Sequence, residues 1–150
     1  MAMRIALLGS GRMAHVYGPK IAAHPAMELA FVFKPNPSSA SAGQAAAAYG
    51  GAAVHDLDEA LAGADAVVIA TPTNTHLEYI EACAKAGKPI YCEKPLDESL
   101  ERVDRCLAAL EAHPVVVSDE FELVSAGTVT LPLIRRRVRA TRRERRHDWP

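Results

Sequence analysis

The sequence is poor in cysteine and has no long hydrophobic run. Its three cysteines, Cys83, Cys92 and Cys106, are odd in number and lack the Cys-x-x-Cys spacing of zinc or redox sites. No cluster of histidines accompanies them, so we expect buried or idle thiols and no metal site. No apolar stretch approaches the roughly 18 residues that span a bilayer, and no secretory signal is visible at either end. We therefore predict a cytoplasmic protein with no membrane partner.

The net charge is close to zero, but the charges are unevenly spread. Residues 1–134 carry 9 Lys or Arg against 16 Asp or Glu, whereas residues 135–150 carry 8 against 2. Eight arginines fall within residues 135–146. Such a run is an arm that binds nucleic acid, a solvated helix, or sequence that belongs to no fold. A chain of 150 residues that is 49% hydrophobic can bury one core, so one domain is expected.

Apolar segments alternate with helix-compatible segments up to about residue 118. The expected strands cover residues 4–8, 28–33, 52–54, 66–70, 89–92 and 114–117. The expected helices cover residues 12–23, 39–49, a segment from 56, 75–86 and 96–112. This alternation predicts an α/β fold with a doubly wound parallel sheet over residues 1–118, followed by an irregular arginine-rich tail over residues 119–150.

A glycine-rich turn follows the first expected strand and opens the first expected helix. It consists of Gly9, Ser10, Gly11, Arg12, Met13 and Ala14. Glycine allows a sharp turn and lets the backbone approach a pyrophosphate, whose charge rests on the helix N-terminus. Alanine at the last position still permits close packing of helix and strand. In this context the turn predicts a dinucleotide-binding site, and the alternative is a purely structural turn.

Lys34 follows the second expected strand, at the position that distinguishes the two nicotinamide cofactors. An acid there accepts a hydrogen bond from the ribose 2'-hydroxyl of NAD, whereas a base accommodates the 2'-phosphate of NADP. The ammonium group of Lys34 attracts a phosphate and cannot act as an acceptor. The alternative is a solvated surface lysine. The predicted cofactor is thus NADP or NAD.

Two further loops follow the fourth and fifth expected strands. In Ala70-Thr71-Pro72-Thr73-Asn74-Thr75-His76, small residues let the backbone run beside a flat ligand, and Asn74 or Thr75 can cap the next helix. The alternative is a capped loop with no ligand. Glu93-Lys94-Pro95 places an ammonium group at a strand's carboxyl end, where it could hydrogen-bond a nicotinamide amide or a substrate hydroxyl. The alternative is a surface ion pair of small consequence.

These motifs, in this order and spacing, resemble the N-terminal domain of the Gfo/Idh/MocA oxidoreductases from residue 3 to about 118. The resemblance implies a Rossmann domain that binds NAD or NADP, with Lys94 near the nicotinamide as the catalytic residue. It also implies hydride transfer between the cofactor and the hydroxyl of a sugar or polyol-like substrate. The expected cofactor-binding residues are Gly9, Ser10, Gly11, Arg12, Met13, Ala14, Lys34, Ala70, Thr71, Pro72, Asn74, His76, Glu93 and Lys94.

Two features depart from the family pattern. Many members have aspartate where this chain has Lys34, and members continue into a second α+β domain that holds the substrate and supplies a catalytic histidine. We expect these 150 residues to lack that domain. A frameshift after about Ser118 would account for the arginine-rich tail, and reading the gene in the other frame tests this hypothesis. Hydride transfer needs a positioned substrate, so we expect dinucleotide binding with little or no turnover.

Three functions are thus open. The first is the dinucleotide-binding domain of an oxidoreductase, for which we expect no nucleic-acid partner. The second is a non-catalytic dinucleotide-binding module whose basic tail binds nucleic acid, and the third is a nonfunctional truncated product. The missing domain would leave an apolar surface bare, which favours self-association into a homo-oligomer.

Overall fold

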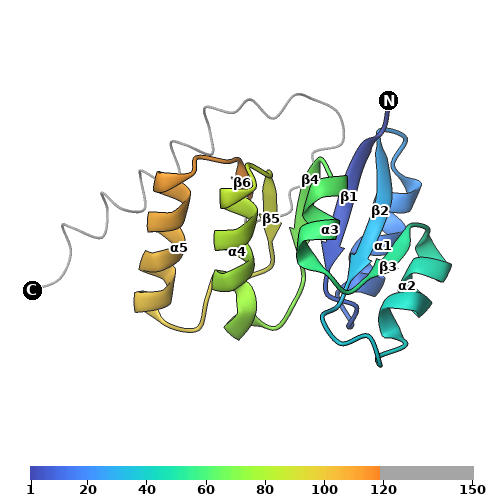
Figure 1. Ribbon diagram of the computed structural model, residues 1–150, viewed down its shortest axis with the longest axis horizontal. Helices are drawn as coiled ribbons and strands as arrows, with labels where there is room; N and C mark the ends of the chain where they lie inside the picture. The colour runs from blue at the N-terminus through green and yellow to red at the C-terminus, as the bar shows by residue number, and fades with distance from the viewer. Residues whose placement is uncertain (119–150) are drawn as a thin grey trace, which may run out of the picture.

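The computed structural model describes residues 1–118, which form one parallel sheet flanked by helices (Figure 1). The strands are β1 (Met3–Leu8), β2 (Met27–Phe33), β3 (Ala52–Val54), β4 (Ala66–Ile69), β5 (Ile90–Cys92) and β6 (Val117–Ser118). They lie in the order β3-β2-β1-β4-β5-β6, and each neighbouring pair is parallel. This is the strand order of the Rossmann fold, so the predicted fold class is confirmed.

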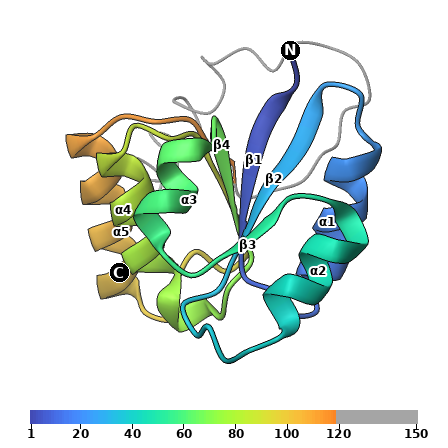
Figure 2. The ribbon, with the colours of Figure 1, turned by 45° about the vertical axis from the view of Figure 1, so that its right-hand side comes forward.

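Helices cover both faces of the sheet. One face carries α1 (Ala14–Ala23) and α2 (Ser41–Tyr49), and the other carries α3 (Leu57–Gly63), α4 (His76–Lys85) and α5 (Leu100–Ala112), as Figure 2 shows. Successive side chains of a strand point to opposite faces. In β1, Ile5 and Leu7 therefore pack with α1 and α2, whereas Ala6 and Leu8 pack with α3 and α4. Burial on both faces explains why residues 5–8 of β1 are all apolar.

Two predicted elements differ from the observed ones by more than two residues at one end. The helix expected from residue 96 begins at Leu100, because Ser99 caps it by accepting a hydrogen bond from the N–H of Arg102 at 3.3 Å. The residues before Ser99 instead form contacts with α4 that are described below. The last strand covers only Val117–Ser118 rather than residues 114–117.

The three thiols are buried, as predicted, and none of them forms a disulfide. Burial raises the pKa of Cys83 to about 12 and that of Cys106 to about 11, so both are neutral at physiological pH. Within residues 1–118 no three metal-binding side chains come together, and no helix is long and apolar enough to cross a membrane. The predicted tail over residues 119–150, with its arginine run, lies outside the described residues.

Candidate functional site

The candidate site lies where the strand order reverses. The chain leaves β1 toward β2 on one side, while β4 occupies the other side of β1. Because all paired strands are parallel, the loops after β1, β2, β4 and β5 meet at one edge of the sheet. In open parallel sheets this point is the usual place for a ligand.

Gly9 holds the first loop between two neighbouring strands. Its N–H donates to the carbonyl of Phe33 at 3.0 Å, at the end of β2. A Cβ at Gly9 would lie 2.6 Å from the carbonyl oxygen of Ala70, and the φ of +107° disfavours any L side chain. Only glycine fits where the loop after β1 meets the loop after β4.

Beyond Gly9 the turn is open toward solvent. Within residues 1–118, the N–H groups of Gly11, Arg12 and Met13 donate to no protein atom, although their carbonyls accept hydrogen bonds from α1. No atom lies within 4 Å of the position that a Cβ on Gly11 would take. The first turn of α1 contains no acidic side chain that could occupy this place. Free N–H groups at a helix start attract anions, so the turn can hold a diphosphate.

Ser10 and Lys34 lie next to this turn, on the α2 side. Ser10 is buried, and its hydroxyl lies 2.7 Å from the hydroxyl of Ser41 at the start of α2. The ammonium group of Lys34 donates to the same Ser41 hydroxyl at 3.2 Å. The structure thus brings together two residues that the sequence assigned to the cofactor site, through a serine that the sequence did not single out.

The loop after β4 is held by its own side chains. The hydroxyl of Thr75 lies 2.9 Å from that of Thr71 and 2.7 Å from the carbonyl oxygen of Pro72. Thr75 is the N-cap residue of α4, but it makes no side-chain capping hydrogen bond. The prediction that Asn74 or Thr75 caps this helix is therefore wrong: the Thr75 hydroxyl turns back into the loop, and Asn74 is exposed.

His76 connects the two loops on the β4–β5 side of the site. Its Nδ1 lies 3.0 Å from the carbonyl oxygen of Pro95, and its Nε2 lies 2.9 Å from that of Thr71. The side chain has an exposed fraction of 0%, so no part of it faces solvent. The His76 ring is thus enclosed between the two loops, with each ring nitrogen within hydrogen-bond distance of a backbone carbonyl. The expectation that His76 contacts the dinucleotide stays a prediction.

Lys94 lies at the same edge as the glycine turn and is exposed. Only Glu93 separates it from Cys92, which pairs with Ile69 at the end of β4. The N–H of Glu93 donates to the carbonyl of Ile69 at 2.9 Å. No carboxylate of residues 1–118, Glu93 included, forms an ion pair with the Lys94 ammonium group. The alternative of a local Glu–Lys surface pair is therefore not observed. The ammonium group is available to a ligand.

A buried acid that the sequence did not single out holds these loops to α4. The carboxylate of Asp97 accepts hydrogen bonds from the N–H of Leu77 at 3.3 Å and of Glu98 at 2.7 Å, and its side chain has an exposed fraction of 0%. Burial alone would raise the pKa of Asp97. The hydrogen bonds from Arg102 and these N–H groups outweigh it and hold that pKa below the ordinary value.

Arg102 completes this network from α5. Its Nε donates to Asp97 at 2.7 Å, and another guanidinium nitrogen donates to Glu78 at 2.9 Å and to the carbonyl of Asn74 at 3.0 Å. Hydrogen bonding to Arg102 lowers the pKa of Glu78. The loop after β4 is thus tied to both α4 and α5. Asn74 and Glu78 belong to one segment and Asp97 and Arg102 to another, more distant one, so local spacing does not indicate that the two segments meet.

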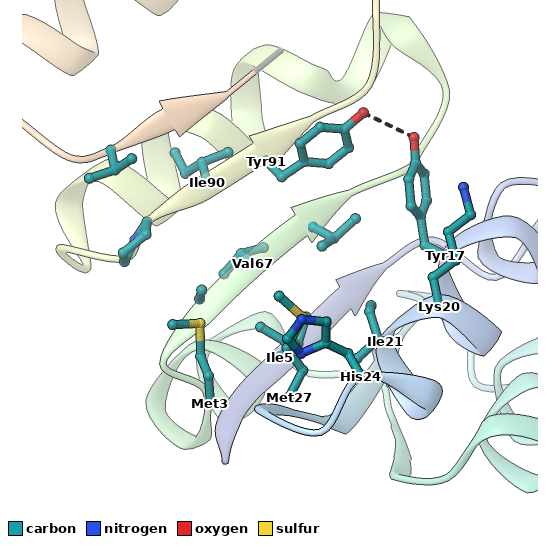
Figure 3. Close-up of a pocket in the computed structure, with 14 residues that line it drawn as sticks. Met3, Ile5, Tyr17, Lys20, Ile21, His24, Met27, Val67, Ile90 and Tyr91 are labelled. Carbon is teal, nitrogen blue, oxygen red and sulfur yellow. Dashed lines mark hydrogen bonds between the residues drawn. The ribbon is translucent and has the colours of Figure 1, made fainter. Parts of the chain in front are cut away.

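A groove with an apolar lining lies on the α1 face of the sheet, separate from this edge (Figure 3). Its floor comes from the amino-terminal parts of the strands, and the hydroxyls of Tyr17 and Tyr91 meet at one end, 3.1 Å apart. Met3, Ile5, Ile21, Met27, Val67 and Ile90 are among its lining residues. Such a lining suits polypeptide rather than a charged diphosphate. Homo-oligomer formation stays a prediction.

Comparison with known proteins places this arrangement in a family. Residues 3–121 match the family GFO_IDH_MocA, described as an oxidoreductase family with an NAD-binding Rossmann fold. The chain belongs to the Gfo/Idh/MocA oxidoreductase family. The predicted resemblance is confirmed, and the matched range covers every residue expected to bind the cofactor.

The similar proteins are longer than this chain. An inositol 2-dehydrogenase of Rhizobium meliloti (strain 1021) is 45% identical over 109 residues, which are 71% of this chain and 32% of that protein. A D-xylose 1-dehydrogenase [NADP(+)] of Haloarcula marismortui is 36% identical over 72 residues, which are 48% of this chain and 19% of that protein. The scyllo-inositol dehydrogenase of Lactobacillus casei was solved with NAD(H) and scyllo-inositol. Its structure matches with a TM-score of 0.70 and 26% identity, over 79% of this chain and 36% of that chain. The chain spans about a third or less of the length of these relatives.

Proposed function

We propose that residues 1–118 bind a nicotinamide dinucleotide, NAD or NADP, in an oxidoreductase that transfers a hydride between the cofactor and a sugar or polyol-like hydroxyl. The free N–H groups of Gly11, Arg12 and Met13 carry this proposal. They point to a diphosphate because they lie at a helix start, and the open space at Gly11 lets the diphosphate approach the backbone. Family membership supports the cofactor class.

The bound dinucleotide would supply the hydride acceptor or donor. The glycine turn binds its diphosphate, and the loop that contains Ala70, Thr71 and Pro72 borders its nicotinamide half. Lys94 orients the ring amide or the substrate hydroxyl, because an ammonium group donates up to three hydrogen bonds and this one has no carboxylate partner within residues 1–118. Asp97 and His76 hold the two loops in place.

Turnover requires more than this arrangement provides. Hydride transfer needs the substrate hydroxyl close to the nicotinamide, with an acid or base within reach. Residues 1–118 provide one side of such a site, with Lys94 as its exposed cation. The polyol substrate class rests on the names of the relatives, which are inositol and sugar dehydrogenases. We therefore propose that residues 1–118 bind the dinucleotide and form one side of the catalytic site.

Substitution of Gly11 tests the proposal. Gly11→Ala places a methyl group where no protein atom lies within 4 Å, so the fold tolerates it, but the methyl group blocks the approach of the diphosphate. We expect the affinity for NADPH or NADH to fall at least about tenfold, which corresponds to about 1.4 kcal/mol. Titration followed by the fluorescence of the reduced nicotinamide measures this change.

Gly43→Ala in α2 is the matched control, because it makes the same change at an exposed glycine whose Cβ position is also open. It should leave the affinity unchanged. Equal affinities for the wild type, Gly11→Ala and Gly43→Ala would show that the glycine turn does not hold the diphosphate.

A further inference from the structure

A cluster of one ammonium group and three hydroxyl groups lies at the carboxyl end of β2. The Ser41 hydroxyl is at its centre, 2.7 Å from the Ser10 hydroxyl, 2.9 Å from the Ser39 hydroxyl and 3.2 Å from the Lys34 Nζ. The four residues come from the glycine turn, the end of β2 and the entry to α2. Ser10 is buried, whereas Ser39, Ser41 and Lys34 are partly exposed, so the cluster faces solvent on one side.

Backbone contacts fix the place of Lys34 relative to the glycine turn. The N–H of Lys34 donates to the carbonyl of Val54 at 3.1 Å, and the carbonyl of Lys34 accepts from Nδ1 of His55 at 2.7 Å. The preceding residue, Phe33, accepts from the N–H of Gly9. In dinucleotide-binding sheets the residue at the end of this strand meets the adenosine ribose. Lys34 is therefore held where the ribose 2'-position would lie.

The entry to α2 fixes the serines on the other side. Asn36 forms a turn in which its side-chain oxygen accepts from the N–H of Ser38 at 3.0 Å and its carbonyl accepts from the N–H of Ser39 at 3.2 Å. This turn directs the chain back toward Lys34, so that Ser39 and Ser41 lie beside it. The first turn of α2 contains no acidic residue.

The chemistry of the cluster suits a phosphate rather than a ribose hydroxyl. Lysine has only donors, and each serine can rotate its hydroxyl proton toward an incoming oxygen. No carboxylate of residues 1–118 forms an ion pair with Lys34. A charged phosphate would receive short, charge-assisted hydrogen bonds from Lys34, whereas the 2'-hydroxyl of NAD would find no carboxylate acceptor.

We infer that Lys34, Ser10, Ser39 and Ser41 form a receptor for the 2'-phosphate, so that the cofactor of this chain is NADP(H) rather than NAD(H). This inference rests on the proposed function, because it requires the dinucleotide to lie on the glycine turn. It narrows that function to one of the two cofactors. It also adds Ser39 and Ser41 to the residues that determine specificity.

Binding measured at one fixed salt concentration tests the inference without any turnover. NADPH and NADH are titrated by fluorescence, and adenosine 2',5'-bisphosphate and adenosine 5'-monophosphate by calorimetry. We expect NADPH to bind at least about tenfold more tightly than NADH, and the bisphosphate to show the same preference over the monophosphate.

Variants assign the preference to the cluster. Lys34→Ala and Ser41→Ala should each weaken NADPH binding about tenfold while changing NADH binding less than about twofold. Lys85→Ala, which removes the same charge at the far end of α4, and Ser38→Ala, whose hydroxyl lies outside the cluster, are the matched controls. Both should leave the preference unchanged. Circular dichroism confirms that each variant is folded.

The outcomes separate the inference from the proposed function. Equal affinities for NADPH and NADH, or an equal loss of both in Lys34→Ala, would overturn the 2'-phosphate receptor and leave dinucleotide binding intact. A folded wild type that binds neither nucleotide would overturn both. Gly11→Ala should weaken both nucleotides together, which distinguishes the diphosphate site from the receptor.

Discussion

The two sides of the candidate site differ in how their polar groups are used. On the β1–β2 side, the N–H groups of Gly11, Arg12 and Met13 have no protein partner within residues 1–118, and Lys34 contacts only neutral groups there. On the β4–β5 side, His76 and Asp97 are buried and their polar atoms are engaged by the protein itself. Buried polar groups that are satisfied internally stabilise a structure, whereas exposed donors without partners are available to a ligand. We therefore propose that the first side binds the dinucleotide and that the buried groups of the second side hold the loops in place.

The largest expected effect comes from removing the central acid of the positioning side. Asp97→Ala deletes hydrogen bonds to the N–H groups of Leu77 and Glu98 and to Arg102, so we expect the free energy of unfolding to fall by about 3 kcal/mol. Urea denaturation measures the loss. Glu81→Ala is the control, because it breaks an exposed ion pair with Arg105 and should cost less than about 1 kcal/mol.

The dependence of stability on pH checks the same acid in the wild type. The pKa of Asp97 is lower in the folded protein than its ordinary value of 3.8 in the unfolded chain. Its stabilisation is therefore complete above that value and is lost as the pH falls through the folded pKa. Asp97→Asn should show a weaker loss of stability in acid. If Asp97→Asn lost as much stability at low pH as the wild type does, the stabilising role of this carboxylate would be contradicted.

A somewhat smaller effect is expected at His76, and it separates positioning from direct contact. His76→Ala removes a buried ring whose nitrogens lie within hydrogen-bond distance of the carbonyls of Thr71 and Pro95, so we expect a loss of about 2 kcal/mol in the free energy of unfolding. Dinucleotide affinity should fall by less than about threefold while the variant is folded. Unchanged stability together with lost binding would mean that the histidine contacts the ligand directly.

The smallest effect on stability is expected at Lys94, which is exposed whereas His76 is buried. This side chain is exposed and has no carboxylate partner within residues 1–118, so Lys94→Ala should change the free energy of unfolding by less than about 0.5 kcal/mol. NADPH should bind about threefold more weakly, because one hydrogen bond to the nicotinamide half is lost. Adenosine 2',5'-bisphosphate, which has no nicotinamide, should bind the variant as it binds the wild type.

Sequence was sufficient where the determinants are local. The alternation of strands and helices predicted the doubly wound parallel sheet, and the glycine turn was recognisable because its residues are contiguous. Local sequence patterns were insufficient where contacts with residues distant in the sequence determine the structure. The start of α5 was placed too early because Asp97 and Ser99 form contacts that no helical period reveals. The burial of His76 between two loops was not predicted either, because it depends on how the loops fold together.

The cluster of Lys34, Ser10, Ser39 and Ser41 was predictable from the sequence only in part. Lys34 could be assigned from its place after the second strand, since strand ends can be located from hydrophobicity. Its partners Ser39 and Ser41 could not, because the turn at Asn36 determines which hydroxyls return to the lysine. The groove on the α1 face was likewise not predictable residue by residue, because its lining comes from several separate segments.

Backbone amide resonances followed by NMR during a titration with NADPH test the central claim most directly. If the glycine turn binds the diphosphate, the amides of Gly11, Arg12 and Met13 should show the largest changes in chemical shift, with those around Lys34 next. Residues of the apolar groove, such as Tyr17 and Tyr91, should change little. Large shifts in the groove with unchanged amides in the turn would contradict the account.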